Sequence, residues 1–206
     1  MSVNKAVYIL FLLFSVGICR AQSNNGYAGV GMQFLEQGDY KSAMLNFNKA
    51  LESDSNDHSA FYMRGRVKQI LEDFHGAMKD FNRAIELNKE SSHYYFERGN
   101  VKFALQDYYG SISDYSEAIR LDVTNVDAYY KRGKAKHQLE AYQDAINDCT
   151  KILEINPKNI DAYYLRGILR IEHGQVESGC LDLSKAGELG DLNAYEVIKN
   201  KCNSKR

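Results

Sequence analysis

The chain has 206 residues, of which 44% are hydrophobic and 26% are charged, and its formal net charge is −1. This near balance of charge excludes the strongly basic surface by which proteins usually bind nucleic acid, so no nucleic-acid partner is expected. The single proline fits a chain that is almost entirely helical. No linker or low-complexity stretch divides the sequence after its first residues, which predicts one elongated domain.

Residues 1–21 are organised like a secretory signal peptide. Lys5 precedes an apolar run over residues 6–18, and a short segment ending at Ala21 provides a cleavage site. The apolar run is shorter than the roughly 20 residues that a membrane-spanning helix needs. We therefore predict an exported protein of a bacterial envelope, periplasmic or secreted, with no membrane span after cleavage.

Two other uses of this segment remain open. It would act as an uncleaved anchor if no peptidase removed it. Lipidation at Cys19 is the second alternative, but the residue before it is Ile18, whereas bacterial lipoprotein signals carry a small residue there.

A glycine recurs at a fixed spacing of 34 residues through the rest of the chain: Gly31, Gly65, Gly99, Gly133 and Gly167. An aromatic residue stands four positions before each of them: Tyr27, Phe61, Tyr95, Tyr129 and Tyr163. Further apolar or small residues follow each glycine at helical spacing, in two stretches per period. A constant period of this length indicates a solenoid.

Each period is predicted to form two antiparallel helices. A glycine inside a helix costs about 1 kcal/mol relative to alanine. That cost is tolerable where the missing Cβ lets a neighbouring helix approach closely. Gly38-Asp39 and Gly174-Gln175 mark turns within a unit, and the segment Asn156-Pro157-Lys158 marks a turn between units.

These features resemble the tetratricopeptide repeat, a helix–turn–helix unit. The resemblance covers residues 24–57, 58–91, 92–125, 126–159 and 160–193. It implies an all-α, right-handed α-solenoid of five repeats. The fifth repeat is the most degenerate, as expected of a terminal unit, and residues 194–206 are predicted to be a capping helix followed by a polar tail.

Two charged columns keep the same phase in repeats two to five. Arginine precedes the glycine at Arg64, Arg98, Arg132 and Arg166, and aspartate follows 16 residues after each arginine at Asp80, Asp114, Asp148 and Asp182. Equal numbers and strict phase favour a structural ladder of ion pairs, within or between units, over a basic stripe for an acidic ligand. A second basic column is predicted to be a solvated edge: Lys68, Lys102, Lys136 and Arg170.

The resemblance also implies where a partner binds, because the first helices of tetratricopeptide arrays line a concave groove. The positions that it assigns to this peptide-binding groove hold Tyr62, Phe96, Tyr130 and Tyr164 in an aromatic column, with His93, Asp127, Asp161, Arg66, Asn100 and Lys134 beside it. Rigid aromatics among mixed polar groups are good peptide anchors. Packing between helices is the alternative role of these aromatics.

Some members of the family clamp the C-terminal carboxylate of chaperone tails with a lysine at the position of the aromatic column. No repeat of this chain has lysine there. The resemblance therefore does not carry that function to this chain.

The cysteines outside residues 1–21 are odd in number. Cys149 stands at a core position and is expected to be buried. Cys180 lies on the last repeat and Cys202 on the capping helix predicted to pack against it, so a disulfide could staple the cap to the array. Two packed thiols are the alternative.

No catalytic, metal-binding or cofactor-binding motif was found in the sequence. There is no Cys-x-x-Cys, no histidine pair at metal-ligand spacing and no phosphate loop. The predicted function is a noncatalytic, monomeric interaction module that binds a protein or peptide, with no cofactor. The alternatives are a structural envelope-assembly adaptor that uses its convex face or its ends, and, less favoured, an enzyme or cofactor carrier.

Overall fold

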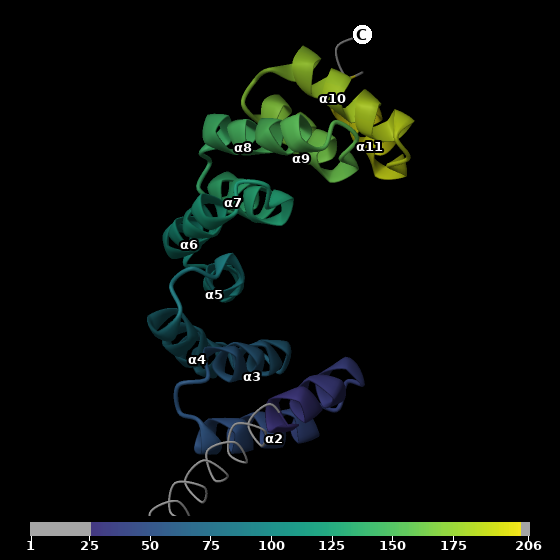
Figure 1. Ribbon diagram of the computed structural model, residues 1–206. Coiled ribbons are helices and arrows are strands. Elements are labelled where there is room, and N and C mark those ends of the chain that lie inside the picture. The colour runs from purple at the N-terminus through teal and green to yellow at the C-terminus, as the bar shows by residue number, and fades with distance from the viewer. Residues whose placement is uncertain (1–25, 203–206) are drawn as a thin grey trace, which may run out of the picture. The chain divides into compact units, whose positions relative to one another are not determined.

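The structure is a computed structural model, and it describes residues 26–202. The predicted signal peptide of residues 1–21, including Cys19, lies outside this range, as do residues 203–206. Within it the chain is helical and contains no strand, which confirms the predicted all-α class (Figure 1). The chain divides into two compact units at Glu90 and Ser91.

Unit 1 contains the first two repeats. Its elements are the helix of residues 26–36, α2 (Tyr40–Ser53), α3 (His58–Ile70) and α4 (Phe74–Leu87). Helices α2 and α3 pack together, as do α3 and α4. Part of the core is a cluster of Ala43, Phe47 and Val67, all fully buried.

Unit 2 contains the other repeats and the C-terminal helices. Its elements are α5 (Ser92–Ala104), α6 (Tyr108–Leu121), α7 (Val126–Gln138), α8 (Tyr142–Ile155), α9 (Ile160–Glu172), α10 (Val176–Glu188), α11 (Leu192–Val197) and the π-helix η1 (Ile198–Cys202). Each helix from α5 to α11 packs against the next one along the chain. The unit is therefore a stack in which consecutive helices are spatial neighbours.

Local sequence explains where most of these helices begin and turn. The side chains of Asp39, Asp73 and Asp107 accept hydrogen bonds from backbone N–H groups in the first turns of α2, α4 and α6. Helix α8 starts after Ala141, which has no side chain that can accept such a bond. The turn before each of these second helices contains a residue with positive φ, such as Gly38 at 77°.

The recurring glycine is where the two helices of a repeat approach each other. A Cβ on Gly65 would lie 2.8 Å from the ring of Phe81, and a Cβ on Gly99 would lie 2.8 Å from the ring of Tyr115. In the fourth repeat the aromatic is replaced by Cys149, and the atom nearest to a Cβ on Gly133 would be a backbone oxygen at 3.6 Å. In the second and third repeats a Cβ at this position would clash with the ring of the second helix, whereas in the fourth repeat there is room for it.

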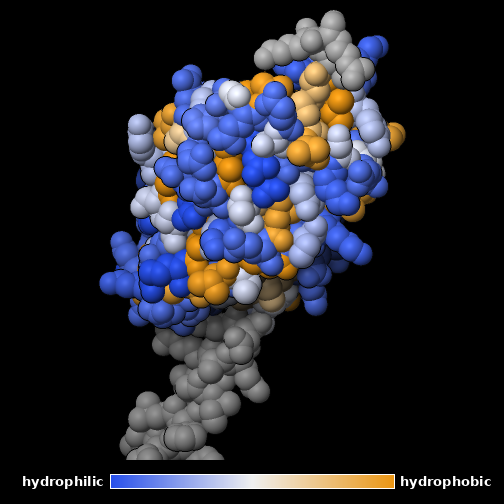
Figure 2. Space-filling view, turned by 90° about the horizontal axis from the view of Figure 1, so that it is seen from above, coloured by the Kyte–Doolittle hydropathy of each residue, from blue (hydrophilic) through white to orange (hydrophobic). Residues whose placement is uncertain are grey.

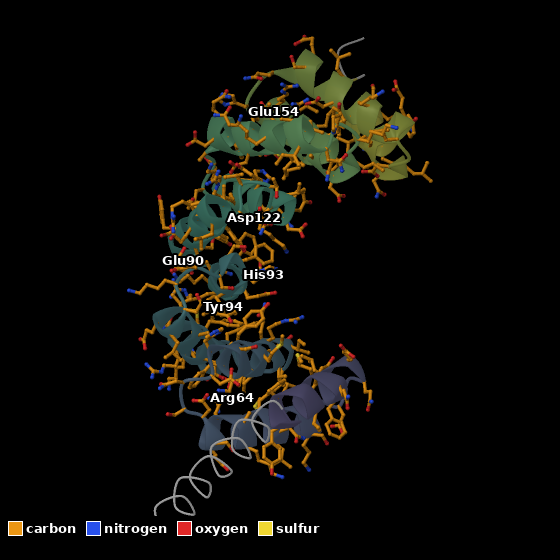
Figure 3. The ribbon with its side chains drawn as sticks, viewed as in Figure 1. Arg64, Glu90, His93, Tyr94, Asp122 and Glu154 are labelled. Atoms are coloured by element: carbon orange, nitrogen blue, oxygen red, sulfur yellow. A yellow bond between two sulfur atoms is a disulfide. The ribbon has the colours of Figure 1, made fainter. Side chains whose placement is uncertain are left out.

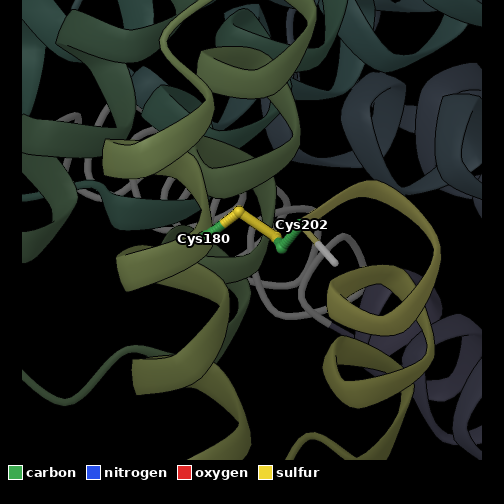
Figure 4. The surroundings of a disulfide bond; sticks show 2 residues. All are labelled: Cys180 and Cys202. Atoms are coloured by element: carbon green, nitrogen blue, oxygen red, sulfur yellow. A yellow bond between two sulfur atoms is a disulfide. The ribbon is translucent and has the colours of Figure 1, made fainter. Parts of the chain in front are cut away.

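The C-terminal end is closed by α11 and η1. Helix α11 begins at Leu192, two residues before the predicted start of the capping helix, because Asp191 accepts a hydrogen bond from Asn193 N–H. The ring of Tyr195 lies over Gly187 of α10. A disulfide joins Cys180 of α10 to Cys202 at the end of η1 (Figure 4). The bridge spans 22 residues and ties the cap to the last repeat.

Among residues 26–202, no helix is both long and apolar enough to cross a bilayer.

Candidate protein-binding face

The two predicted charged columns lie against each other in the structure. Arg64 donates from Nε and Nη2 to both carboxylate oxygens of Asp80, at 2.9 and 2.6 Å (Arg64 is labelled in Figure 3). The same bidentate pair occurs between Arg98 and Asp114, between Arg132 and Asp148, and between Arg166 and Asp182. All four pairs join the two helices of one repeat.

The second basic column is part of the same network, so the prediction of a solvated edge was wrong. Lys68 contacts Asp80 at 2.8 Å, and Lys102 and Lys136 contact the aspartates of their own repeats at the same distance. Arg170 takes this place in the fifth repeat, 2.7 Å from Asp182. The aspartates are only 3–5% exposed, and a buried carboxylate needs partners on both oxygens.

The arginines also connect one repeat to the previous one. Arg132 donates from Nη1 to the hydroxyl of Ser116 at 2.9 Å, and Arg166 donates to the hydroxyl of Thr150 at 3.2 Å. In unit 1 Arg64 donates to the amide oxygen of Asn48 at 2.8 Å. We call the network of arginine, aspartate and the second cation the ion-pair ladder, and its groups are engaged inside the protein.

The first repeat has no rung of this ladder. At the equivalent positions it carries Val30, Phe34 and Asn46, all uncharged. The Asn46 side chain instead donates to the backbone oxygen of Ser42 at 2.9 Å. The three positions are therefore charged together or uncharged together, which is the behaviour of one structural unit.

The aromatic column of unit 2 lies on the first helices of its repeats. Phe96 on α5, Tyr130 on α7 and Tyr164 on α9 are all half-buried. Each packs against a cluster of buried residues, for example Tyr130 against the cluster that contains Cys149. Tyr62 has the equivalent place in unit 1, 6.0 Å from the ring of Phe81. The inner part of each ring is held by the core, and the rest remains accessible.

Polar groups flank these rings. Lys134 lies over the ring of Tyr130 at 6.0 Å, and burial together with the nearby Asp161 carboxylate raises the pKa of Tyr130. The side chains of Asp127 and Asp161 are exposed. Asn100 accepts a hydrogen bond from the buried Tyr115 hydroxyl at 3.0 Å, so it is partly a structural residue.

His93 lies at the start of α5 and is exposed. Hydrogen bonds from Thr124 lower the pKa of the Asp122 carboxyl at the C-terminal end of α6, and the nearby His93 imidazole lowers it slightly further (Asp122 and His93 are labelled in Figure 3). His93 therefore belongs to the edge of this face, beside the turn that joins α6 to α7.

The structure also contains a feature that sequence analysis missed. A pocket of about 270 Å³ lies in unit 1 between the helix of residues 26–36 and α3, and Arg66 is one of its lining residues. Its apolar walls come from Met32 and Ile70, which stand at predicted groove positions of their repeats but were not singled out. The signal in the sequence was an apolar side chain at a position that the resemblance assigns to the groove.

The buried thiol of the fourth repeat is poorly suited to chemistry. Cys149 is fully buried, and desolvation raises its pKa to about 12. A thiol in this state is not a nucleophile near neutral pH. In residues 26–202 no cluster of three or more histidine, cysteine or carboxylate side chains could hold a metal ion.

Several solved structures have a fold similar to that of this chain. A structure described as "Crystal structure of MamA" is 23% identical, with a TM-score of 0.75, and the match covers 81% of this chain and 97% of that one. A structure of YrrB, described as "a TPR protein with an unusual peptide-binding site", is 21% identical, with a TM-score of 0.75 and coverage of 84% and 90%. A structure of PilF from Pseudomonas aeruginosa is 17% identical, with a TM-score of 0.74 and coverage of 87% and 82%. At these identities the likeness establishes the fold.

Family models match most of the chain. Models described as "Tetratricopeptide repeat" match residues 27–57, 58–91, 126–159 and 149–180, and a model described as "TPR repeat" matches residues 99–140. No curated protein matches the sequence. The matched ranges contain all five recurring glycines and most residues of the ion-pair ladder, and the chain belongs to the tetratricopeptide-repeat family.

Proposed function

We propose that this chain is a noncatalytic protein-interaction module, and that it binds a peptide or a partner helix on the face of its first helices. The observation that carries the proposal is the aromatic column of Phe96, Tyr130 and Tyr164. These rings are anchored in the core and stand among polar side chains that differ from repeat to repeat. Fixed aromatics with varied polar neighbours are typical of surfaces that recognise one particular segment.

The ion-pair ladder supports this choice of surface by elimination. Each of its aspartates is held by two cations of the same repeat, so these side chains are engaged in contacts within the protein, although each rung keeps a net charge of +1. The tetratricopeptide fold and the peptide-binding site named for YrrB make a protein or peptide the favoured class of partner. A solenoid functions through the surface that it presents.

We further propose that the protein is exported to the bacterial envelope and acts as a monomer. The signal-like composition of residues 1–21 supports export. The Cys180–Cys202 disulfide is suited to an oxidising compartment such as the periplasm. N-terminal sequencing of the protein recovered from a periplasmic extract tests this, because export with cleavage predicts a chain that starts at Gln22.

The binding face is tested by affinity capture from an envelope extract. The chain without residues 1–21 serves as bait, beside a Tyr130→Ala, Tyr164→Ala double variant whose fold is checked by circular dichroism. The matched control is Tyr109→Ala, which removes a tyrosine that is 76% exposed on the second helix of the third repeat. A partner captured by the parent and by the control, and lost from the double variant, supports the proposal. Equal capture by all three baits would refute it.

The end of the array is a second candidate surface. Figure 2 looks onto the end of unit 2 that carries α10 and α11, and it shows hydrophobic patches between hydrophilic side chains. Leu181 of α10 and Leu192 of α11 are 73% and 77% exposed. A structural adaptor would use such an end, and it would lose its partner on Leu181→Ser, Leu192→Ser substitution while the double tyrosine variant kept it.

A further inference from the structure

The pocket in unit 1 has an apolar wall built on the core. Leu35, Tyr40 and Met63 line it and also pack against the buried cluster of Ala43, Phe47 and Val67. Met32 and Ile70 complete the wall and are 41% and 45% exposed. The pocket is therefore a depression with a firm base and an apolar opening, and its volume of about 270 Å³ is enough for one large side chain.

Two methionines in this wall make it adaptable. The thioether side chain is unbranched and polarizable, and it adjusts to aliphatic and aromatic groups alike. The recognised group is thus a bulky apolar side chain of either kind, leucine or phenylalanine in size.

Arg66, which stands beside this wall, differs from the paired arginines of the ion-pair ladder. Arg66 is half-buried and lines the pocket, and its guanidinium lies over the ring of Tyr62 at 5.9 Å. In the described part of the chain no carboxylate or other acceptor pairs with Arg66, unlike Arg64, two residues away. Its donors have lost part of their water without gaining protein acceptors, and a guanidinium in this position favours a carboxylate in the forked geometry.

Glu36 is the other charged residue of the pocket, and it opposes this preference. It is exposed, and no cation pairs with it within residues 26–202. Because it is well solvated it loses little by remaining unpaired. A carboxylate bound to Arg66 would nevertheless be weakened by this like charge nearby.

We propose that this pocket is a specificity subsite that takes a bulky apolar side chain of a partner protein together with an adjacent carboxylate, which Arg66 binds. The carboxylate belongs to an aspartate, a glutamate or the C-terminus of the partner segment. This inference rests on the proposed function and specifies one element of the sequence that the module recognises.

The test uses a panel of synthetic peptides on a constant polar background. Each peptide carries leucine or phenylalanine followed by aspartate or glutamate, and its partner peptide carries the matching amide in place of the acid. A third set ends in the apolar residue, with a free or an amidated C-terminus. Binding to the chain without residues 1–21 is measured by fluorescence anisotropy, and the parent is expected to bind the acidic member of a pair about tenfold more tightly.

Four single variants test the two charges and the apolar opening of the pocket. Arg66→Gln is expected to abolish the preference for the acid, while Arg66→Lys retains part of it. Glu36→Gln is expected to tighten binding of the acidic peptide, because it removes the like charge. Ile70→Glu fills the opening of the pocket with a charge and is expected to weaken every peptide, and since Ile70 is exposed the fold is retained.

The results distinguish this subsite from the broader function. If no peptide binds, or if the acid is not preferred, the subsite is wrong. If the preference persists in Arg66→Gln, the carboxylate lies elsewhere and the assignment is overturned. The proposed function survives either result when the capture experiment still depends on Tyr130 and Tyr164. If capture did not depend on Tyr130 and Tyr164 while the preference for the acidic peptide persisted, we would instead assign the binding function to unit 1.

Discussion

The second and fourth repeats have the same polar network but different cores. Arg64, Lys68 and Asp80 form the rung of the second repeat, and their equivalents form the rung of the fourth at nearly identical distances. The ring of Phe81 packs beneath Gly65, whereas the fourth repeat places Cys149 there. The rung is retained where the core residue has changed.

The two repeats also differ at the start of their second helices. Asp73 caps α4 through its carboxylate, and Ala141 at the equivalent place leaves α8 without a side-chain cap. The fourth repeat has thus accepted a smaller core side chain and the loss of a cap while it kept all three charges of its rung. This follows from the energies involved, because an unpaired buried charge costs more than a cap.

The largest expected effect comes from breaking one rung. Asp148→Ala removes the acceptor shared by Arg132 and Lys136, and we expect the free energy of unfolding to fall by about 3 kcal/mol. Urea unfolding followed by circular dichroism measures the change. The control replaces the whole rung by the residues of the first repeat, as Arg132→Val, Lys136→Phe and Asp148→Asn. This triple variant should be more stable than the single one, and the opposite order would show that the rung is not one unit.

The glycine comparison is expected to give effects of opposite sign. Gly65→Ala would force a Cβ against the ring of Phe81, and overpacking of this kind costs about 2 kcal/mol. Gly133→Ala has room for the Cβ and should gain up to about 1 kcal/mol from better helix propensity. The two variants are compared in the same unfolding assay. Equal losses in both would contradict the different packing around the two glycines.

We expect the buried thiol of Cys149 to make the free energy of unfolding fall at alkaline pH. The pKa of Cys149 is raised in the folded protein, so above the pKa of the unfolded thiol only the unfolded state releases the proton. Stability therefore decreases as pH rises, by about 1.5 kcal/mol for this group between about pH 8 and pH 10. The measurement is the difference in unfolding free energy between the parent and Cys149→Val at both pH values. A difference that does not change with pH would show that Cys149 is accessible to solvent.

The smallest effects concern the caps. Ala141→Ser supplies a neutral hydroxyl to the first turn of α8 without adding charge beside Asp144, and should stabilise by about 1 kcal/mol. Asp73→Ala removes the cap of α4 and should destabilise by a similar amount. Thermal unfolding of both variants checks this, and a stabilising effect of Asp73→Ala would rule out the cap.

The repeat, its period and the helix pair were predictable from the sequence, because glycine spacing and helical periodicity are local properties of the chain. It also placed arginine and aspartate in one phase, so that ion pairs such as that between Arg98 and Asp114 could be expected. The cap at the C-terminus was predictable from the apolar pattern after the last repeat, to within two residues of its observed start.

The partner of each charged side chain, in contrast, depends on how the helices pack. Lys102 looks like any solvated lysine along the sequence, yet the approach of α5 to α6 brings it to Asp114. The sequence placed Arg66 on the groove face, but only the packing of α3 against the helix of residues 26–36 shows that it lines a pocket and pairs with no carboxylate among residues 26–202. Pairing and exposure depend on which side chains of separate helices meet, and that is fixed by packing in three dimensions and not by spacing along the chain.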